Sequence, residues 1–173
     1  MNAKKLIVIL VGVVVAAGTA YMVYQKQAIE KKHQQELAEQ ANAKDPWIVA
    51  NEEWLAQVAQ EEGAQKTQNG IVYKVLQQGE GTVPTTASTV RVHYEGSDIN
   101  GKVFDSSYDR GEPTEFGVTQ VIKGWTEIIC MMPVGSKWEV YIPAELAYGK
   151  NAAGDIFPNS ALKFIIELLD IVE

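Results

Sequence analysis

The sequence is 173 residues long and has a formal net charge of −7, from 15 Lys+Arg against 22 Asp+Glu. Because it is acidic and has no cluster of basic residues, we expect no binding along a nucleic-acid backbone. A single cysteine, Cys130, excludes an intrachain disulfide. The two histidines lie far apart and give no metal-ligand spacing, so we expect neither a metal nor a cofactor.

The N-terminal segment, residues 1–25, is strongly apolar. Leu6 to Tyr24 is a run of 19 residues without a charge, preceded by Lys4 and Lys5. As a helix it would span roughly 28 Å, close to the ~30 Å hydrocarbon core of a bilayer. A signal anchor and a cleavable signal peptide both fit such a run. We favour the anchor, because the apolar run continues past the small residues Gly18-Thr19-Ala20.

Residues 26–66 are predicted to form a helical stalk followed by a lead-in helix. The part up to Lys44 is rich in Gln, Ala, Glu and Lys, which favour helix, but its apolar residues form no continuous stripe. Asp45-Pro46 is expected to break this helix. Asn51 is then expected to cap a short helix over residues 52–62. The stalk serves either as a dimer contact or as a solvated spacer, and the sequence does not distinguish the two.

From Thr67 onward, apolar and polar residues alternate in short runs, which is typical of β-strands. Val90, Val92 and Tyr94, for example, would share one face of a strand. Similar alternation occurs in residues 71–76, 137–142 and 162–168. Asn100-Gly101 predicts a type I′ hairpin turn. Only residues 121–132 follow helical spacing, so we expect an α+β fold in which an antiparallel sheet packs on one short helix.

Several motifs in this region are specific enough to compare with a family. They are Val92-His93-Tyr94-Glu95-Gly96, Gly101 to Tyr108, Arg110-Gly111-Glu112-Pro113, Val121 to Trp125, Leu146 to Gly149, and Pro158 to Phe164. In order and spacing they resemble the motifs of FKBP-type peptidyl-prolyl cis-trans isomerases over residues 67–173. Residues 51–65 resemble the lead-in of bacterial members related to the macrophage infectivity potentiators. The resemblance implies an antiparallel sheet wrapped around one short helix.

The resemblance also implies a substrate pocket. Trp125 would form its floor, Asp105 would form its polar edge and pair with Arg110, and Val121 and Ile122 would lie at the start of the helix. The expected catalytic residues are Tyr94, Phe104, Asp105, Trp125, Tyr148 and Phe164. The expected substrate-binding residues are Arg110, Val121, Ile122 and Ile156.

Two positions depart from the family pattern. Thr114 stands where many members place an aromatic wall residue, and Phe157 replaces a proline before Pro158. The first departure is expected to widen or weaken the pocket, and the second to reshape the loop above Tyr148. Both keep an alternative function open, a non-catalytic chaperone or adaptor that holds proline-containing segments.

The resemblance therefore implies a peptidyl-prolyl isomerase that acts on proline-containing polypeptides and assists the folding of extracytoplasmic proteins. The expected location is the bacterial inner membrane, with one N-terminal anchor and the catalytic domain in the periplasm. Cleavage of the N-terminal segment would instead leave a free periplasmic protein. Two further partners are left open: a macrolide-type inhibitor in the same pocket, and a second copy of the chain through the stalk.

Overall fold

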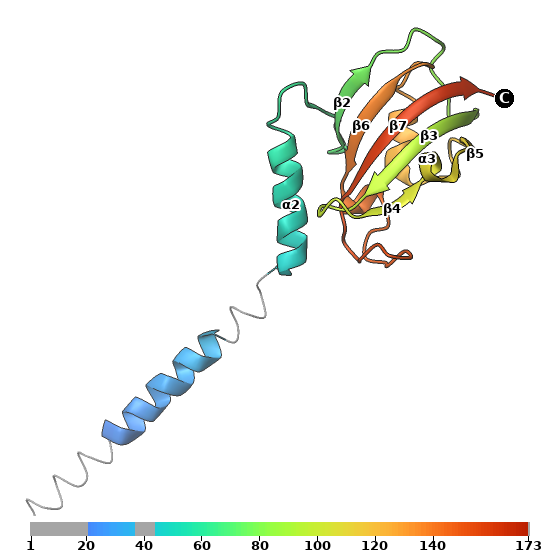
Figure 1. Cartoon of the computed structure of the whole chain (residues 1–173). Helices are drawn as coiled ribbons and strands as arrows, with labels where there is room; N and C mark the ends of the chain where they lie inside the picture. The colour runs from blue at the N-terminus through green and yellow to red at the C-terminus, as the bar shows by residue number, and fades with distance from the viewer. Residues whose placement is uncertain (1–20, 37–43, 173) are drawn as a thin grey trace, which may run out of the picture. The chain divides into compact units, whose positions relative to one another are not determined.

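The computed structural model describes residues 21–36 and 44–172. The chain divides into two units, Met1–Lys44 and Asp45–Glu173. In the first unit residues 21–36 are helical (Figure 1). The predicted signal anchor or signal peptide lies almost entirely outside the described residues. Within residues 21–36 and 44–172, no helix combines the length and the apolar character that crossing a membrane requires.

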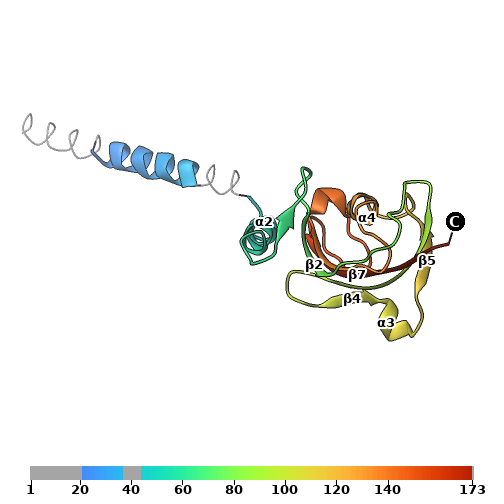
Figure 2. The ribbon, with the colours of Figure 1, turned by 90° about the horizontal axis from the view of Figure 1, so that it is seen from above.

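The second unit is an antiparallel sheet with helices on both faces. Its elements are α2 (Pro46–Val58), β1 (Gln65–Lys66), β2 (Val72–Gln77), β3 (Thr89–Ser97), β4 (Val103–Ser106), α3 (Ser107–Arg110), β5 (Thr114–Gly117), α4 (Lys123–Ile129), β6 (Lys137–Ile142), the 3₁₀ helix η1 (Ala144–Leu146) and β7 (Leu162–Ile171). The strand order is β1-β2-β6-β7-β3-β4, and β5 pairs with β3. Figure 2 shows the sheet curving around α4. The predicted α+β arrangement of one sheet around a short helix is confirmed.

The core lies between the concave face of the sheet and α4. Alternation along β7 buries Leu162, Phe164, Ile166 and Leu168 on this face. The buried Val90 and Val92 of β3 join the same core. The period-two pattern in the sequence therefore placed these strand faces correctly, because successive side chains of a strand point to opposite faces of the sheet and the apolar set faces α4.

Helix α2 begins earlier than the sequence predicted. Its N-cap is Asp45, whose side chain accepts a hydrogen bond from the backbone N–H of Trp47 at 2.8 Å. Pro46 occupies the first turn, where its missing N–H costs no hydrogen bond. The prediction that Asn51 caps this helix was wrong. Asn51 lies inside α2 and is 3% exposed; its side chain donates to the Trp47 carbonyl one turn earlier and accepts from the N–H of Ala161.

The turn between β3 and β4 also differs from its prediction. A type I′ turn needs positive φ at both central residues, but only Gly101 of the Asn100-Gly101 pair has it, at 77°. The side chain of Asp98 explains the difference, because it accepts hydrogen bonds from the N–H groups of Asn100 and Lys102 at 2.8 and 2.9 Å. The N–H of Gly101 bonds to the carbonyl of Asp98 at 3.0 Å. The longer loop needs only one left-handed residue.

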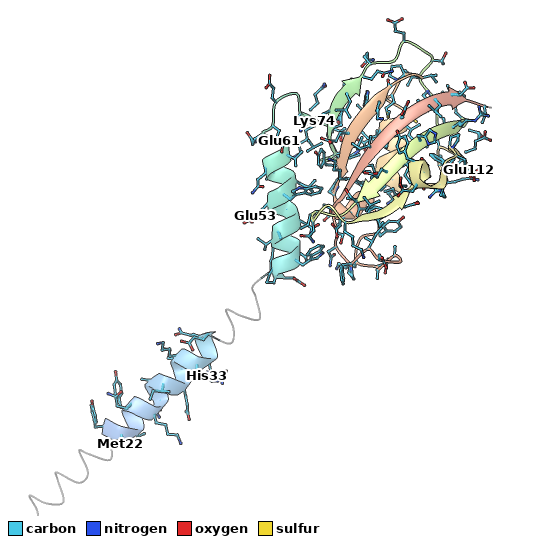
Figure 3. The ribbon with its side chains drawn as sticks, viewed as in Figure 1. Met22, His33, Glu53, Glu61, Lys74 and Glu112 are labelled. Carbon is cyan, nitrogen blue, oxygen red and sulfur yellow. The ribbon has the colours of Figure 1, made fainter. Side chains whose placement is uncertain are left out.

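Helix α2 covers part of the convex face of the sheet (Figure 1). Val58 of α2 packs with Val72 and Tyr141, and the Trp54 ring meets the Tyr141 ring edge-on at 5.2 Å. Beyond the end of the helix, Glu61 forms an ion pair with Lys74 of β2 (Figure 3). The helix is therefore part of the same folded unit as the sheet.

Candidate active site

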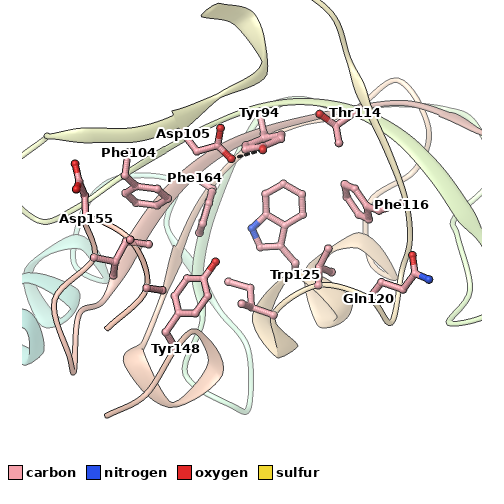
Figure 4. A pocket seen from close by; sticks show the side chains of 15 residues that line it. Tyr94, Phe104, Asp105, Thr114, Phe116, Gln120, Trp125, Tyr148, Asp155 and Phe164 are labelled. Atoms are coloured by element: carbon pink, nitrogen blue, oxygen red, sulfur yellow. Dashed lines mark hydrogen bonds between the residues drawn. The ribbon is translucent and has the colours of Figure 1, made fainter. Parts of the chain in front are cut away.

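A pocket of about 740 Å³ opens beside α4 on the concave side of the sheet (Figure 4). It falls within the size range of small-molecule and substrate sites, ~300–1,000 Å³. Its walls come from β3, β4, β5, β7 and the loop after η1. The lining residues are Tyr94, Phe104, Asp105, Thr114, Phe116, Gln120, Val121, Ile122, Trp125, Tyr148, Ala153, Gly154, Asp155, Ile156 and Phe164.

Trp125 of α4 lies at the centre of the aromatic wall and is 4% exposed. The rings of Tyr94 and Phe164 stand nearly perpendicular to its indole, with centroids at 5.1 and 5.2 Å. Phe116 lies at 5.4 Å on another side. Edge-to-face contacts of this kind hold aromatic rings in defined orientations. The pocket is therefore apolar and its wall is held by mutual packing.

The pocket depends on a glycine where two phenylalanine rings meet. Gly96 of β3 pairs with Phe164 of β7 on one side and with Asp105 of β4 on the other. A Cβ atom at Gly96 would lie 2.7 Å from ring atoms of both Phe104 and Phe164. Only a residue without a side chain lets these rings approach to a centroid distance of 5.7 Å.

The polar edge of the pocket is a network around Asp105. Its two carboxylate oxygens accept hydrogen bonds from the Tyr94 hydroxyl and the Arg110 guanidinium. Arg110 also donates to the Tyr94 hydroxyl at 3.1 Å and to Thr114 Oγ1 at 3.2 Å. The Asp105 charge is thus bonded to fixed partners, which suits a positioning role better than proton transfer.

This network shifts two pKa values. Burial alone raises the pKa of the Asp105 carboxyl, but the hydrogen bonds from Tyr94 and Arg110 outweigh burial and leave the pKa below its ordinary value. Burial, followed by the hydrogen bond to Asp105, raises the pKa of the Tyr94 hydroxyl. Near neutral pH, Asp105 is therefore ionised and Tyr94 is protonated.

Tyr148, in the loop after η1, provides a hydroxyl at the opposite side of the pocket (Figure 4). Its side chain is 40% exposed, and within residues 44–172 no group forms a hydrogen bond with the hydroxyl. A donor without an internal partner can bond to a bound carbonyl oxygen at no internal cost. In the same loop, Asp155 pairs with Lys102 at 2.9 Å.

A sequence profile described as FKBP-type peptidyl-prolyl cis-trans isomerase matches residues 81–169. The chain belongs to this family. Its FKBP-type domain carries the pocket, because the matched range contains every lining residue.

Individual family members agree with this assignment. The chain is 52% identical over 120 residues to the FKBP-type 22 kDa peptidyl-prolyl cis-trans isomerase of Escherichia coli (strain K12), covering 69% of this chain and 58% of that protein. It is 47% identical over 104 residues to the outer membrane protein MIP of Legionella longbeachae, covering 60% and 45%. The crystal structure of FkpA from Escherichia coli aligns with a TM-score of 0.70 and 35% identity, covering 99% of this chain and 73% of that chain. The chain spans about half the length of these two curated relatives.

The FKBP-type fold brings nine of the ten predicted site residues to the pocket wall. The tenth, Arg110, is bonded to two of them from the end of α3. Val121 and Ile122 directly precede α4, and Ile122 is its N-cap. Whether each residue contributes to catalysis or substrate binding stays a prediction.

Sequence reasoning missed Phe116, Gln120 and the loop residues Ala153 to Asp155. For Phe116 a signal existed. It lies two residues after Thr114 on β5, so both side chains project from the same face of the strand. Phe116 thus supplies an aromatic ring beside the position where Thr114 lacks one.

Phe157 is not among the lining residues and is 67% exposed. Its ring lies 6.0 Å from that of Trp47 on α2.

In residues 21–36 and 44–172, no group of three or more His, Cys, Asp or Glu side chains could hold a metal ion.

Proposed function

We propose that this chain is a peptidyl-prolyl cis-trans isomerase that turns X-Pro bonds in the pocket above Trp125. The observation that carries the proposal is an apolar aromatic wall facing one free hydroxyl donor, on an FKBP-type domain. No covalent step is needed, so neither a nucleophile nor a cofactor is assigned.

The chemistry follows from the amide bond. Rotation about the peptide C–N bond has a barrier of ~18–20 kcal/mol, because resonance gives that bond partial double-bond character. In the twisted transition state the resonance is lost, and the carbonyl oxygen carries less negative charge. Water therefore stabilises the planar ground state more than the twisted state. A dry aromatic pocket removes this bias and lowers the barrier.

Each part of the pocket has a place in this scheme. Trp125, Phe104 and Phe164 would enclose the proline ring. Tyr148 would donate a hydrogen bond to a substrate carbonyl and so hold one side of the turning bond. Asp105, kept ionised by its hydrogen bonds from Tyr94 and Arg110, would hold Tyr94 in place along the rim. Val121, Ile122 and Ile156 would contact the flanking residues of the substrate.

The proposed substrates are proline-containing segments of unfolded or folding chains, and the same apolar pocket would accept macrolide-type inhibitors. We also propose that the domain works outside the cytoplasm, tethered to the inner membrane by residues 1–25 or released after cleavage. The uncharged run Leu6 to Tyr24 supports the tether. A relative named as an outer membrane protein supports only the location outside the cytoplasm. Dimerisation of two copies of the chain through the stalk is a proposal that rests on the sequence alone.

The test is a proline-limited peptide isomerisation assay with the full chain. The wild type is expected to speed the exchange, which takes roughly 10–100 s without a catalyst. Phe104→Ala is expected to remove most of the gain, with circular dichroism as the control for folding. A wild-type rate equal to that in buffer would contradict catalysis. If proline-containing peptides nevertheless bound, the alternative of a non-catalytic chaperone or adaptor would be favoured.

A further inference from the structure

Asn51 is a buried polar residue inside α2, outside the range matched by the FKBP-type profile. Its side-chain carbonyl Oδ1 accepts a hydrogen bond from the backbone N–H of Ala161 at 2.7 Å. Its amide Nδ2 donates to the carbonyl of Trp47 at 2.8 Å. Asn51 is 3% exposed and has little access to water, so these two bonds satisfy its buried amide group. The side chain thus joins α2 to a point 110 residues later in the chain.

Ala161 ends the pocket loop, defined here as residues 147–161. This loop provides Tyr148, Gly154 and Ile156 to the pocket wall. The Trp47 ring of α2 approaches the same loop at Phe157, with ring centroids 6.0 Å apart. Helix α2 therefore touches the loop at two places, Phe157 and Ala161.

The pocket loop is also bonded within itself. Ala153 and Ile156 exchange two backbone hydrogen bonds of 3.1 and 2.9 Å, and the N–H of Asn159 bonds to the carbonyl of Gly149 at 2.6 Å. The Ser160 hydroxyl donates to the carbonyl of Phe157 at 2.7 Å. Because these bonds tie the two arms of the loop together, fixing one arm limits the movement of the other.

We infer that Asn51 and Trp47 are positioning residues of the isomerase site, acting on Tyr148 and Ile156 through the pocket loop. The inference rests on the proposed function. It extends the functional site to α2, which lies outside residues 81–169, the range that the family profile matches. It also gives Phe157, a departure from the family pattern, a partner in Trp47.

The opposing view is that α2 only adds stability. Val58 offers a matched control, because it is also 3% exposed on α2 but packs against Val72 and Tyr141, on the convex face of the sheet. Val58→Ala removes part of the packing against Val72 and Tyr141 and leaves the Asn51 and Trp47 contacts to the pocket loop in place. Asn51→Leu removes the acceptor for the Ala161 N–H while keeping a side chain of similar size. Trp47→Leu is a milder second variant that removes the ring contact.

The experiment compares full-length wild type, Asn51→Leu, Trp47→Leu and Val58→Ala in two measurements. One is kcat and KM for a proline-containing peptide, and the other is amide hydrogen exchange of residues 149–161. We expect Asn51→Leu to lower kcat/KM roughly tenfold, since misplacing a contact by ~1 Å can cost up to ~100-fold. Trp47→Leu should lower kcat/KM less. Both variants should speed exchange in the loop, whereas Val58→Ala should lower Tm and leave both readouts as in the wild type.

The inference is overturned if Asn51→Leu and Trp47→Leu leave kcat/KM and loop exchange unchanged. It is also overturned if Val58→Ala changes both readouts as much as Asn51→Leu. An inactive wild type would contradict the proposed function alone. The exchange comparison would then still decide whether α2 positions the loop, because it requires no turnover.

Discussion

The concave and convex faces of the sheet both carry clustered aromatic side chains, but the two clusters are covered differently. On the concave face, Trp125 with Tyr94 and Phe164 lines a pocket of about 740 Å³. On the convex face, Tyr141 is 5% exposed, because Trp54 and Val58 of α2 pack over it. Aromatic content alone does not mark a site. An aromatic cluster becomes a candidate site where the packing around it leaves a pocket, as on the concave face.

The charged groups on the two faces are also arranged differently. On the convex face, Lys74 and Lys163 lie over the Tyr141 ring at 6.0 and 5.7 Å from its centroid, and both pair with Glu139. On the concave face, Asp105 and Arg110 form a pair at the rim, and the floor of the pocket is left apolar. The charges on the convex face surround the packed ring of Tyr141, whereas those on the concave face border the open pocket.

The sharpest test of this comparison pairs Trp125→Ala with Tyr141→Ala. Each removes a buried aromatic side chain, so each should lower the free energy of unfolding by about 3–5 kcal/mol. Only Trp125→Ala should also reduce isomerase activity, by roughly 100-fold through loss of the surface that positions the proline. Urea unfolding and the peptide assay measure the two effects. Equal activity losses in the two variants would break the distinction between the faces.

A second pair separates two neighbouring wall positions. Phe116→Ala should lower kcat/KM roughly 2- to 10-fold, because an aromatic pair contributes ~0.5–1.5 kcal/mol and Phe116 packs on Trp125. Thr114→Ala should lower it less, since Thr114 adds only one hydrogen bond from Arg110. A larger loss of kcat/KM in Thr114→Ala than in Phe116→Ala would contradict the view that the Phe116 ring is the main contribution of β5 to the pocket wall.

The third prediction concerns pH. The lowered pKa of Asp105 means that its interactions stabilise the fold above its ordinary pKa, near 4, and that this stability is lost as pH falls through the lower folded value. Because both side chains of the Asp105–Arg110 pair are 42% exposed, solvent screens the pair and its contribution to stability should be small. Arg110→Ala should raise the Asp105 pKa, measured by carboxyl carbon NMR during an acid titration.

Lys163→Ala is the convex counterpart of this experiment. Burial alone raises the Glu139 pKa, but hydrogen bonds from Lys163 and Tyr141 leave it lowered, so this variant should raise it. It should not alter isomerase activity, whereas Arg110→Ala should reduce it. Matching activity changes in the two variants would contradict separate roles for the two charged groups.

The smallest expected effect lies at the mouth of the pocket. Lys102 and Asp155 form an ion pair at 2.9 Å, with side chains 60% and 71% exposed. Lys102→Ala should change the free energy of unfolding by less than about 0.5 kcal/mol, because water and salt screen such pairs. A thermal scan at low and high salt measures this. A loss of several kcal/mol would mean that the pair holds the loop in place.

The strands and the aromatic floor could be predicted because they depend on local patterns and on ordered motifs. Alternation located the buried face of β7, and the motifs located Trp125. The role of Asn51 could not be predicted, because its partner Ala161 lies 110 residues away. A Ser, Thr, Asp or Asn near a helix start looks like a cap when tertiary contacts are unknown. The prediction of a type I′ turn at Asn100-Gly101 was wrong for a similar reason. The Asp98 side chain accepts hydrogen bonds from the N–H groups of Asn100 and Lys102 and stabilises a different loop.

The central claim, that substrate turns over on the concave face, has one direct test. The chain has four tryptophans, and the indole N–H of Trp125 has no hydrogen-bond partner within the described residues. NMR of the full chain with a proline-containing peptide would follow the indole signals and peptide cis-trans exchange together. The account predicts that the Trp125 signal shifts, the Trp54 signal does not, and exchange accelerates. Accelerated exchange with a shift at Trp54 alone, or no acceleration, would contradict it.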